Sequence, residues 1–194
     1  MSDKINIVVV EENPQRATTI LEGLRDAGDY YITVIDNPIG LARNLADLEA
    51  DVVLIGLDNP SRDTLEEMTA ASSPAERPVA MFVDCDDSYM MKAAINAGVS
   101  AYVVDGLRRD RIKTILETAI ARFHSFARLR SELLATKAAL AERKTIDKAK
   151  GLLMKARGLS EIEAYELIRK TAMDQGKRMV EVSEGLVTAA ALLS

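Results

Sequence analysis

Two hydrophobic periods alternate along roughly the first 120 residues of the chain. Five short runs, four of them nearly all apolar as in strands buried on both faces, are separated by segments whose apolar residues recur at helical spacing. The predicted strands are Ile5–Val10, Tyr31–Ile35, Val52–Leu57, Val79–Val83 and Ala101–Val104. The predicted helices between them are Pro14–Ala27, Pro38–Leu48, Arg62–Ala70 and Asp87–Ala97. This alternation predicts an α/β domain in which helices cover both faces of a five-stranded parallel sheet.

After the fifth strand the pattern becomes helical. Proline is absent beyond Arg108 and no turn signal precedes Gly151, so one long linker helix is predicted to leave the first domain. Within it, apolar residues recur at alternating three- and four-residue steps, and Thr136 completes the register. These residues, the linker seam, are Phe126, Leu129, Leu133 and Leu140. A seam of about two heptads predicts a short coiled coil and a homodimer. An antiparallel helix pair and packing against the first domain are open alternatives.

The tail is predicted to form a small all-α domain of three helices. Gly158 and Gly176 are typical helix ends, and Ser160 with Glu163 forms an S-x-x-E capping box. The helices are predicted over 146–157, between Ser160 and Gly176, and over 179–193. No single helix is stable alone, so we expect a shared core. Its predicted members are Ile146, Leu153, Met154, Ile162, Tyr165, Leu167, Ile168, Val182, Leu186 and Ala189.

These patterns divide the chain into three predicted segments: an α/β domain at 1–122, a helical linker at 123–142 and the three-helix domain at 143–194. The composition, 48% hydrophobic and 28% charged, is typical of a soluble globular protein. No apolar stretch approaches the roughly 20 residues of a membrane span, and no secretory pattern opens the chain, so we expect a cytoplasmic protein. With one cysteine and one histidine, Cys85 and His124, an internal disulfide is excluded and a zinc site or catalytic triad is not expected. We interpret both as packing residues, and expect no cofactor.

Charge separates the two halves of the chain. Residues 1–120 carry a net charge of −10 and residues 121–194 a net charge of +5, which together give the −5 of the whole chain. A basic tail behind an acidic first domain predicts that the tail meets a polyanion. A lysine-rich, solvated helix surface is the alternative. The candidate contacts are Arg143, Lys144, Lys148, Lys150, Lys155, Arg157, Arg169, Lys170, Lys177 and Arg178.

The ends of the strands show a family resemblance. The acidic pair after the first strand, D-V-V-L-I-x-L-x-x-P-x-x-D around the third and A-G-V-S-A-Y-V-V around the fifth occur in the order and spacing of response-regulator receiver domains. The domain therefore resembles a receiver domain, with its flavodoxin-like fold, over residues 4–122. The resemblance implies a site with two carboxylates holding Mg²⁺, an aspartate accepting a phosphoryl group, and a hydroxyl residue and a lysine binding it.

Most of that phosphorylation site is missing here. Glu11 and Glu12 match the metal-binding carboxylates, but Gly56 stands at the acceptor position, Val83 or Asp84 at the hydroxyl position, and Asp105 at the lysine position. Asp58, the nearest substitute acceptor, lies about 6.6 Å further along the strand. We interpret the site as degenerate. Residual metal binding by the glutamate pair, or a pair that is merely solvated, both stay open.

The tail carries a second, more specific resemblance. I-D-x-A-K-G-L-L-M at 146–154 followed by S-E-x-E-A-Y-E-L-I-R-K-T-A-M at 160–173 resembles the ANTAR domain, an RNA-binding antiterminator module. The resemblance implies that the tail binds paired hairpins in the leader of an mRNA and prevents a terminator from forming. The whole chain is most similar to NasT-type regulators of nitrate assimilation, in which a nitrate- or nitrite-sensing partner of the NasS type, rather than a kinase, controls activity.

The predicted function is thus RNA-binding antitermination under a sensor protein, with no enzymatic activity and no DNA or membrane partner. Two alternatives remain: a phosphorylation-dependent response regulator that binds DNA, and a phosphorelay component with real aspartyl-phosphate turnover.

Overall fold

The computed structural model describes residues 4–37, 39–58, 60–84 and 87–193, and the chain forms two compact units, Met1–Arg128 and Leu129–Ser194. The boundary between these units falls within the predicted linker. Two predicted features, a helix start at Pro38 and packing by Cys85, lie outside the described residues. No helix among the described residues is long and apolar enough to cross a bilayer.

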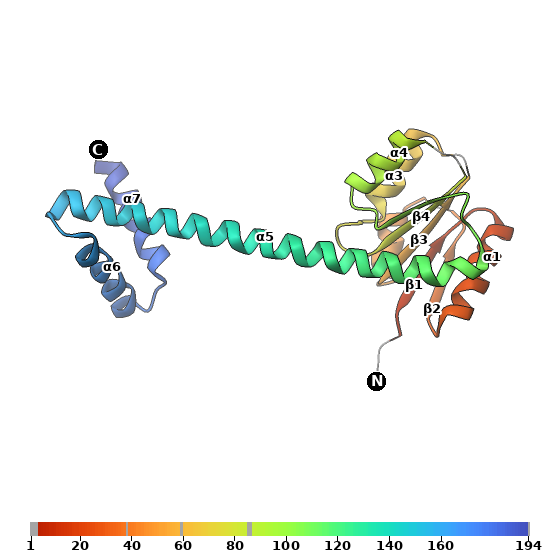
Figure 1. Cartoon of the computed structure of the whole chain (residues 1–194), viewed down its shortest axis with the longest axis horizontal. Helices are drawn as coiled ribbons and strands as arrows, with labels where there is room; N and C mark the ends of the chain where they lie inside the picture. The colour runs from red at the N-terminus through yellow and green to blue at the C-terminus, as the bar shows by residue number, and fades with distance from the viewer. Residues whose placement is uncertain (1–3, 38, 59, 85–86, 194) are drawn as a thin grey trace. The chain divides into compact units, whose positions relative to one another are not determined.

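The first unit contains the predicted parallel sheet (Figure 1). Its strand order is β2-β1-β3-β4-β5, the order of flavodoxin-like folds, and every neighbouring pair is parallel. The strands are β1 Asn6–Val10, β2 Tyr31–Ile35, β3 Val52–Leu57, β4 Val79–Val83 and β5 Ala101–Val104. The strand predictions are therefore confirmed to within one residue. All five residues of β4 are buried, as in a strand covered on both faces.

Helices cover both faces of this sheet. Leu41, Leu65 and Ala94, from α2, α3 and α4, share one core cluster, and Ile20 of α1 and Ile112 of α5 belong to the other. The bounds are α1 Pro14–Ala27, α2 Leu41–Asp47, α3 Arg62–Ala71, α4 Ser88–Asn96 and α5 Arg109–Arg157. The predicted second helix was too long: α2 begins after Gly40, whose positive φ of 73° is incompatible with a helical turn.

The long helix α5 is continuous through Gly151, so the predicted linker helix and the first helix of the tail are one element. It supplies its first part to the sheet unit and the rest to the second unit. His124 is exposed on it and packs against one neighbouring ring, that of Phe123, edge to face with 5.6 Å between the ring centroids, rather than in a core.

The second unit adds α6 Glu161–Gln175 and α7 Met179–Leu193, as predicted. Both halves of the capping box at Ser160 and Glu163 are present. The Ser160 backbone N–H donates to Glu163 and lowers the pKa of that carboxyl. Gly158 and Gly176, with φ values of 66° and 60°, end the helices that precede them.

The core of this second unit differs from the predicted one. Its buried residues are mostly small, Ala149, Ala164, Ile168, Ala172, Val180 and Ser183. The buried face of α6 follows a four-residue step from Ala164, and Ile162 lies about 160° away from it around the helix. Ile162, Tyr165 and Met154 are 77%, 42% and 37% exposed, and Ala189 is also exposed. Their assignment to the core was therefore wrong in the single chain.

Candidate functional site

The carboxyl ends of the strands bring most of the predicted phosphorylation-site residues to one edge of the sheet. Glu11, Glu12, Gly56 and Asp58 line one cleft there. A second cleft is lined by Arg16, Asp84 and Asp105 together with Asn13, Gln15, Thr19 and Leu107. Val83, by contrast, is buried in β4. These residues lie together because all strands of a parallel sheet end at the same edge.

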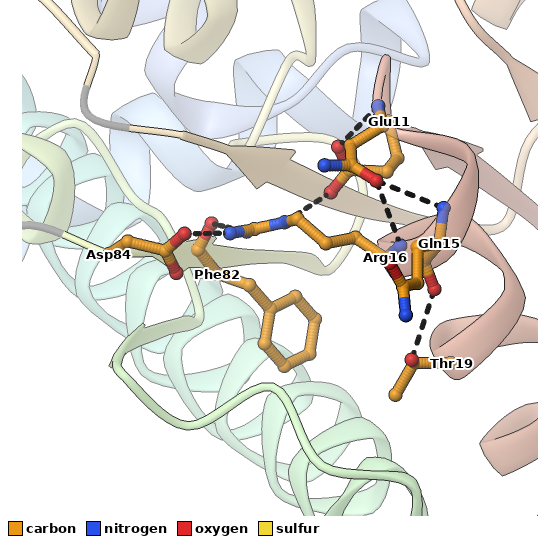
Figure 2. A network of polar contacts seen from close by, with 7 residues as sticks. Glu11, Gln15, Arg16, Thr19, Phe82 and Asp84 are labelled. Carbon is orange, nitrogen blue, oxygen red and sulfur yellow. Dashed lines mark hydrogen bonds and ion pairs between the residues drawn. The ribbon is translucent and has the colours of Figure 1, made fainter.

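An arginine that sequence reasoning missed occupies the middle of this edge (Figure 2). The Arg16 Nε donates to Glu11 Oε2 at 2.9 Å, Nη2 donates to the carbonyl of Phe82 at 3.3 Å, and Nη1 forms an ion pair with Asp84. The side chains of Arg16 and Glu11 are only 13% and 2% exposed. The guanidinium is thus a largely buried cation between two carboxylates.

The start of α1 positions this arginine. Asn13 caps the helix, and its side-chain oxygen accepts hydrogen bonds from the backbone N–H groups of Gln15 and Arg16. The backbone N–H of Asn13 in turn donates to the other oxygen of Glu11 at 2.9 Å. Both carboxylate oxygens of Glu11 are therefore satisfied from within the chain.

Gly56 is explained by the same network. A Cβ at this position would lie 1.7 Å from Glu11 Oε2, so any side chain would displace the Glu11 carboxylate from Arg16. The two glutamates are consequently not equivalent: Glu11 is buried and paired, and Glu12 is exposed. The alternative that both glutamates are merely solvated is therefore wrong for Glu11. Among the described residues, no group of three or more His, Cys, Asp or Glu side chains could hold a metal ion.

The ten basic residues predicted for the tail fall into two classes. Four have intramolecular partners: Arg143 with Asp147 at 3.9 Å, Lys150 with Asp147 and Glu161, Arg169 with Glu166 at 3.6 Å, and Arg178 with Glu142 at 2.6 Å. The other six are exposed, and within the described part of the chain they form no ion pair. They are Lys144, Lys148, Lys155, Arg157, Lys170 and Lys177.

Lys150 is structural in this arrangement. Its ammonium lies 2.7 Å from both Asp147 and Glu161, joining α5 to the first turn of α6, and its side chain is only 14% exposed. Its hydrogen bonds raise the pKa of Lys150, the one to Asp147 more than the one to Glu161. The hydrogen bond between Lys150 and Asp147 also lowers the pKa of Asp147. A ligand phosphate would have to displace two carboxylates to reach it.

The linker seam is uncovered in the single chain. Phe126, Leu129, Leu133 and Leu140 are 63%, 54%, 54% and 53% exposed. Large apolar side chains repeated along one side of a helix at this exposure form an unpartnered face.

Comparisons with known proteins agree with both parts of the fold. Residues 135–187 match the ANTAR domain family, so the second unit contains an ANTAR domain. The transcriptional regulatory protein PdtaR of Mycobacterium tuberculosis is 27% identical over 179 residues, covering 92% of this chain and 87% of the relative. The nitrate regulatory protein of Klebsiella oxytoca is 42% identical over 86 residues, which are 44% of this chain and 21% of that protein. Both relatives are named as regulatory proteins.

The first unit has the receiver fold. A response regulator from Thermotoga maritima superimposes with a TM-score of 0.53 at 16% identity, covering 61% of this chain and 99% of that one. At this identity the likeness concerns the fold alone. The predicted combination of a receiver fold, a long helix and an ANTAR domain is confirmed.

Proposed function

We propose that this chain, an ANTAR domain behind a receiver fold, is a transcription antiterminator that binds paired hairpins in the leader of an mRNA. The observation that supports this most directly is the ANTAR match over a unit whose exposed lysines have no partner in the described structure. Lys144, Lys148 and Lys155 can hold phosphates without displacing an internal carboxylate. Such contacts supply affinity, and contacts to unpaired loop bases supply sequence preference.

We infer that a protein, and not a phosphoryl group, controls the first unit. The Arg16 guanidinium already occupies the strand-end site, Gly56 cannot accept a phosphoryl group, and Asp105 replaces the cation that would bind it. Asp58, Asp84 and Asp105 would repel a dianionic phosphoryl group. Similarity to a nitrate regulatory protein favours a nitrate- or nitrite-sensing partner of the NasS type for nitrate assimilation genes. Binding of this partner masks the tail or the seam, and its release frees the tail for RNA.

We further infer that a second copy of the chain covers the linker seam. In heptad terms Phe126, Leu133 and Leu140 are a positions, and Leu129 and Thr136 are d positions. The flanking e positions are Arg130, Lys137 and Lys144. An antiparallel pair would place these cations against one another. A parallel pair places them against the g positions Ser125, Glu132 and Ala139, which are free of positive charge, so the parallel homodimer is favoured.

Replacing one seam leucine should dissociate this dimer. Leu133→Asp places two charges in the dimer interface and removes two buried leucines, so the dimer dissociation constant should rise at least about 100-fold. Leu134→Asp is the matched control, because Leu134 is similarly exposed, at 58% against 54% for Leu133, but lies off the seam. Sedimentation velocity across a concentration series measures both. If the two variants have the same dimer dissociation constant, or if the wild type is monomeric at every concentration, the linker seam is not a dimer interface.

RNA binding itself is tested by comparing a two-hairpin leader RNA with duplex DNA of the same sequence. We expect protection of the RNA hairpins from nuclease and little protection of the DNA. If each module contacts about four phosphates, the logarithm of RNA affinity should fall with the logarithm of salt concentration with a slope near −3. A preference for duplex DNA would support a DNA-binding regulator instead, and a flat salt response would exclude the basic surface as the contact.

A further inference from the structure

One side of α5 carries a row of cations that is longer than the ANTAR match. The row consists of Arg130, Lys137, Lys144, Lys148 and Lys155. At 100° per residue these five directions fall within an arc of about 40°, and the row extends about 38 Å along the helix axis. All five side chains belong to the second unit and are exposed, and in the described part of the chain none of them forms an ion pair.

This row is free of carboxylates. The acidic residues of α5 in the second unit, Glu132, Glu142 and Asp147, lie about 80° or more from the middle of the row around the helix. A merely solvated helix surface usually mixes the two signs of charge, as in the Arg143–Asp147 pair on another side of the same helix. Segregated positive charge along one line is typical of a surface that follows a polyanion.

Gly151 adds an independent observation on the same side of α5. It lies in the helix interior, where glycine costs about 1 kcal/mol relative to alanine. Its φ is not positive, and, apart from its chain neighbours and the backbone of its own helix, no described atom lies within 4 Å of a Cβ built on it. Nothing in the described part of the chain therefore requires a glycine there. Since Gly151 lies between Lys148 and Lys155, the missing side chain opens the helix backbone to whatever the lysines bind.

We propose that the RNA backbone lies along α5 from Arg130 to Lys155 and approaches the helix most closely at Gly151. This inference rests on the proposed RNA-binding function and extends the contact surface into the linker, since Arg130 precedes the ANTAR match at 135–187. Arg130, Lys137 and Lys144 flank the linker seam as e positions, so they stay at the rim of a parallel dimer and can contact phosphates there.

The first arm of the test uses Gly151→Ala in the full-length chain. The methyl group should raise the midpoint of thermal unfolding, because alanine favours the helix, and yet weaken RNA binding several-fold by blocking close approach. Gly185→Ala is the matched control: Gly185 also lies inside a helix with nothing within 4 Å of a built Cβ, but α7 carries no basic residue. It should be similarly stabilised with unchanged affinity.

The second arm uses Arg130→Gln with Lys137→Gln. Loss of two phosphate contacts should lower affinity about tenfold at 0.15 M salt and reduce the salt slope by about 1.4. The matched control is Lys113→Gln with Arg122→Gln, which removes the same charge from the first part of α5. It should change neither the RNA affinity nor the salt slope. The probe is a fluorescent RNA of two tandem hairpins, titrated at protein concentrations where sedimentation shows each variant in the same oligomeric state.

Wild-type affinity in Gly151→Ala, or equal behaviour of the two glutamine pairs, would overturn this inference. If Lys148→Glu with Lys155→Glu still abolished binding in that case, the proposed RNA function would stand without the extended row. A wild-type chain that fails to bind hairpin RNA, or binds an acidic protein surface in preference to it, would overturn both.

Discussion

Lys148→Glu together with Lys155→Glu should lower the affinity for hairpin RNA by at least about 100-fold. Both side chains are exposed, and the described structure gives neither of them an ion-pair partner. Losing two phosphate contacts accounts for about tenfold at 0.15 M salt, and two new negative charges facing phosphates account for a similar further loss. Fluorescence anisotropy titrations at several salt concentrations measure the affinity and its salt slope.

The structure also predicts that this pair of substitutions leaves the fold intact. Glutamate and lysine have similar helix propensities, and a glutamate at position 155, in the last turn of α5, costs only about 0.3 to 1 kcal/mol against the helix dipole. Helicity should therefore match that of the wild type, and the unfolding midpoint should fall by no more than a few degrees. Lys92→Glu with Lys113→Glu changes the net charge equally at exposed sites in the first unit and should bind RNA normally. A comparable loss in this control would mean that net charge, and not a defined surface, governs binding.

The elements of this fold could be predicted closely because each is encoded locally. Five mostly apolar runs became five strands, and Ser160, Gly158 and Gly176 mark helix ends where their side-chain chemistry or backbone freedom acts within a few residues. The error at α2 was also local. The apolar spacing predicts an earlier start, but the left-handed backbone of Gly40 delays the start of the helix to Leu41.

The roles of individual charged and aromatic residues were harder to predict because they depend on contacts between elements. In the sequence Arg16 is one basic residue in an amphipathic helix that begins shortly after Glu11. The sheet topology brings Asp84, which is 68 residues away, to the same guanidinium. The sequence assigns Lys150 to the basic surface, but in the structure its ammonium is paired with Glu161 at the start of α6. A useful signal was available in Gly56, since a glycine inside a buried strand often marks a close approach by another group.

Arg16→Met should destabilise the first unit by about 3 to 5 kcal/mol. Removing the guanidinium leaves Glu11, whose side chain is 2% exposed, as a buried charge without its cation. Leaving a buried charge unpaired is among the most destabilising single substitutions. Urea unfolding followed by circular dichroism measures the loss. Arg43→Met is the matched control: Arg43 is paired with Asp47 at 3.7 Å, but its side chain is 88% exposed, so the expected change is below about 1 kcal/mol.

The double variant Glu11→Gln with Arg16→Met separates charge from packing. Without a carboxylate to compensate, part of the lost stability should return, because a neutral amide is far cheaper to bury than an anion. If the double variant is as unstable as the sum of the two single ones, Arg16 acts through its aliphatic contacts and the ion pair is incidental.

Divalent cations then test whether the guanidinium takes the place of a metal ion. In Arg16→Met the Glu11 and Asp84 carboxylates, with exposed Glu12 close by in the chain, face a site that has lost its cation, so Mg²⁺ or Mn²⁺ should raise the unfolding midpoint of this variant. The wild type should be insensitive to both ions and should gain no mass on incubation with Mg²⁺ and acetyl phosphate. Stabilisation of the wild type by Mg²⁺, or a phosphoryl adduct on it, would mean that Arg16 yields to the metal and that the receiver site still works.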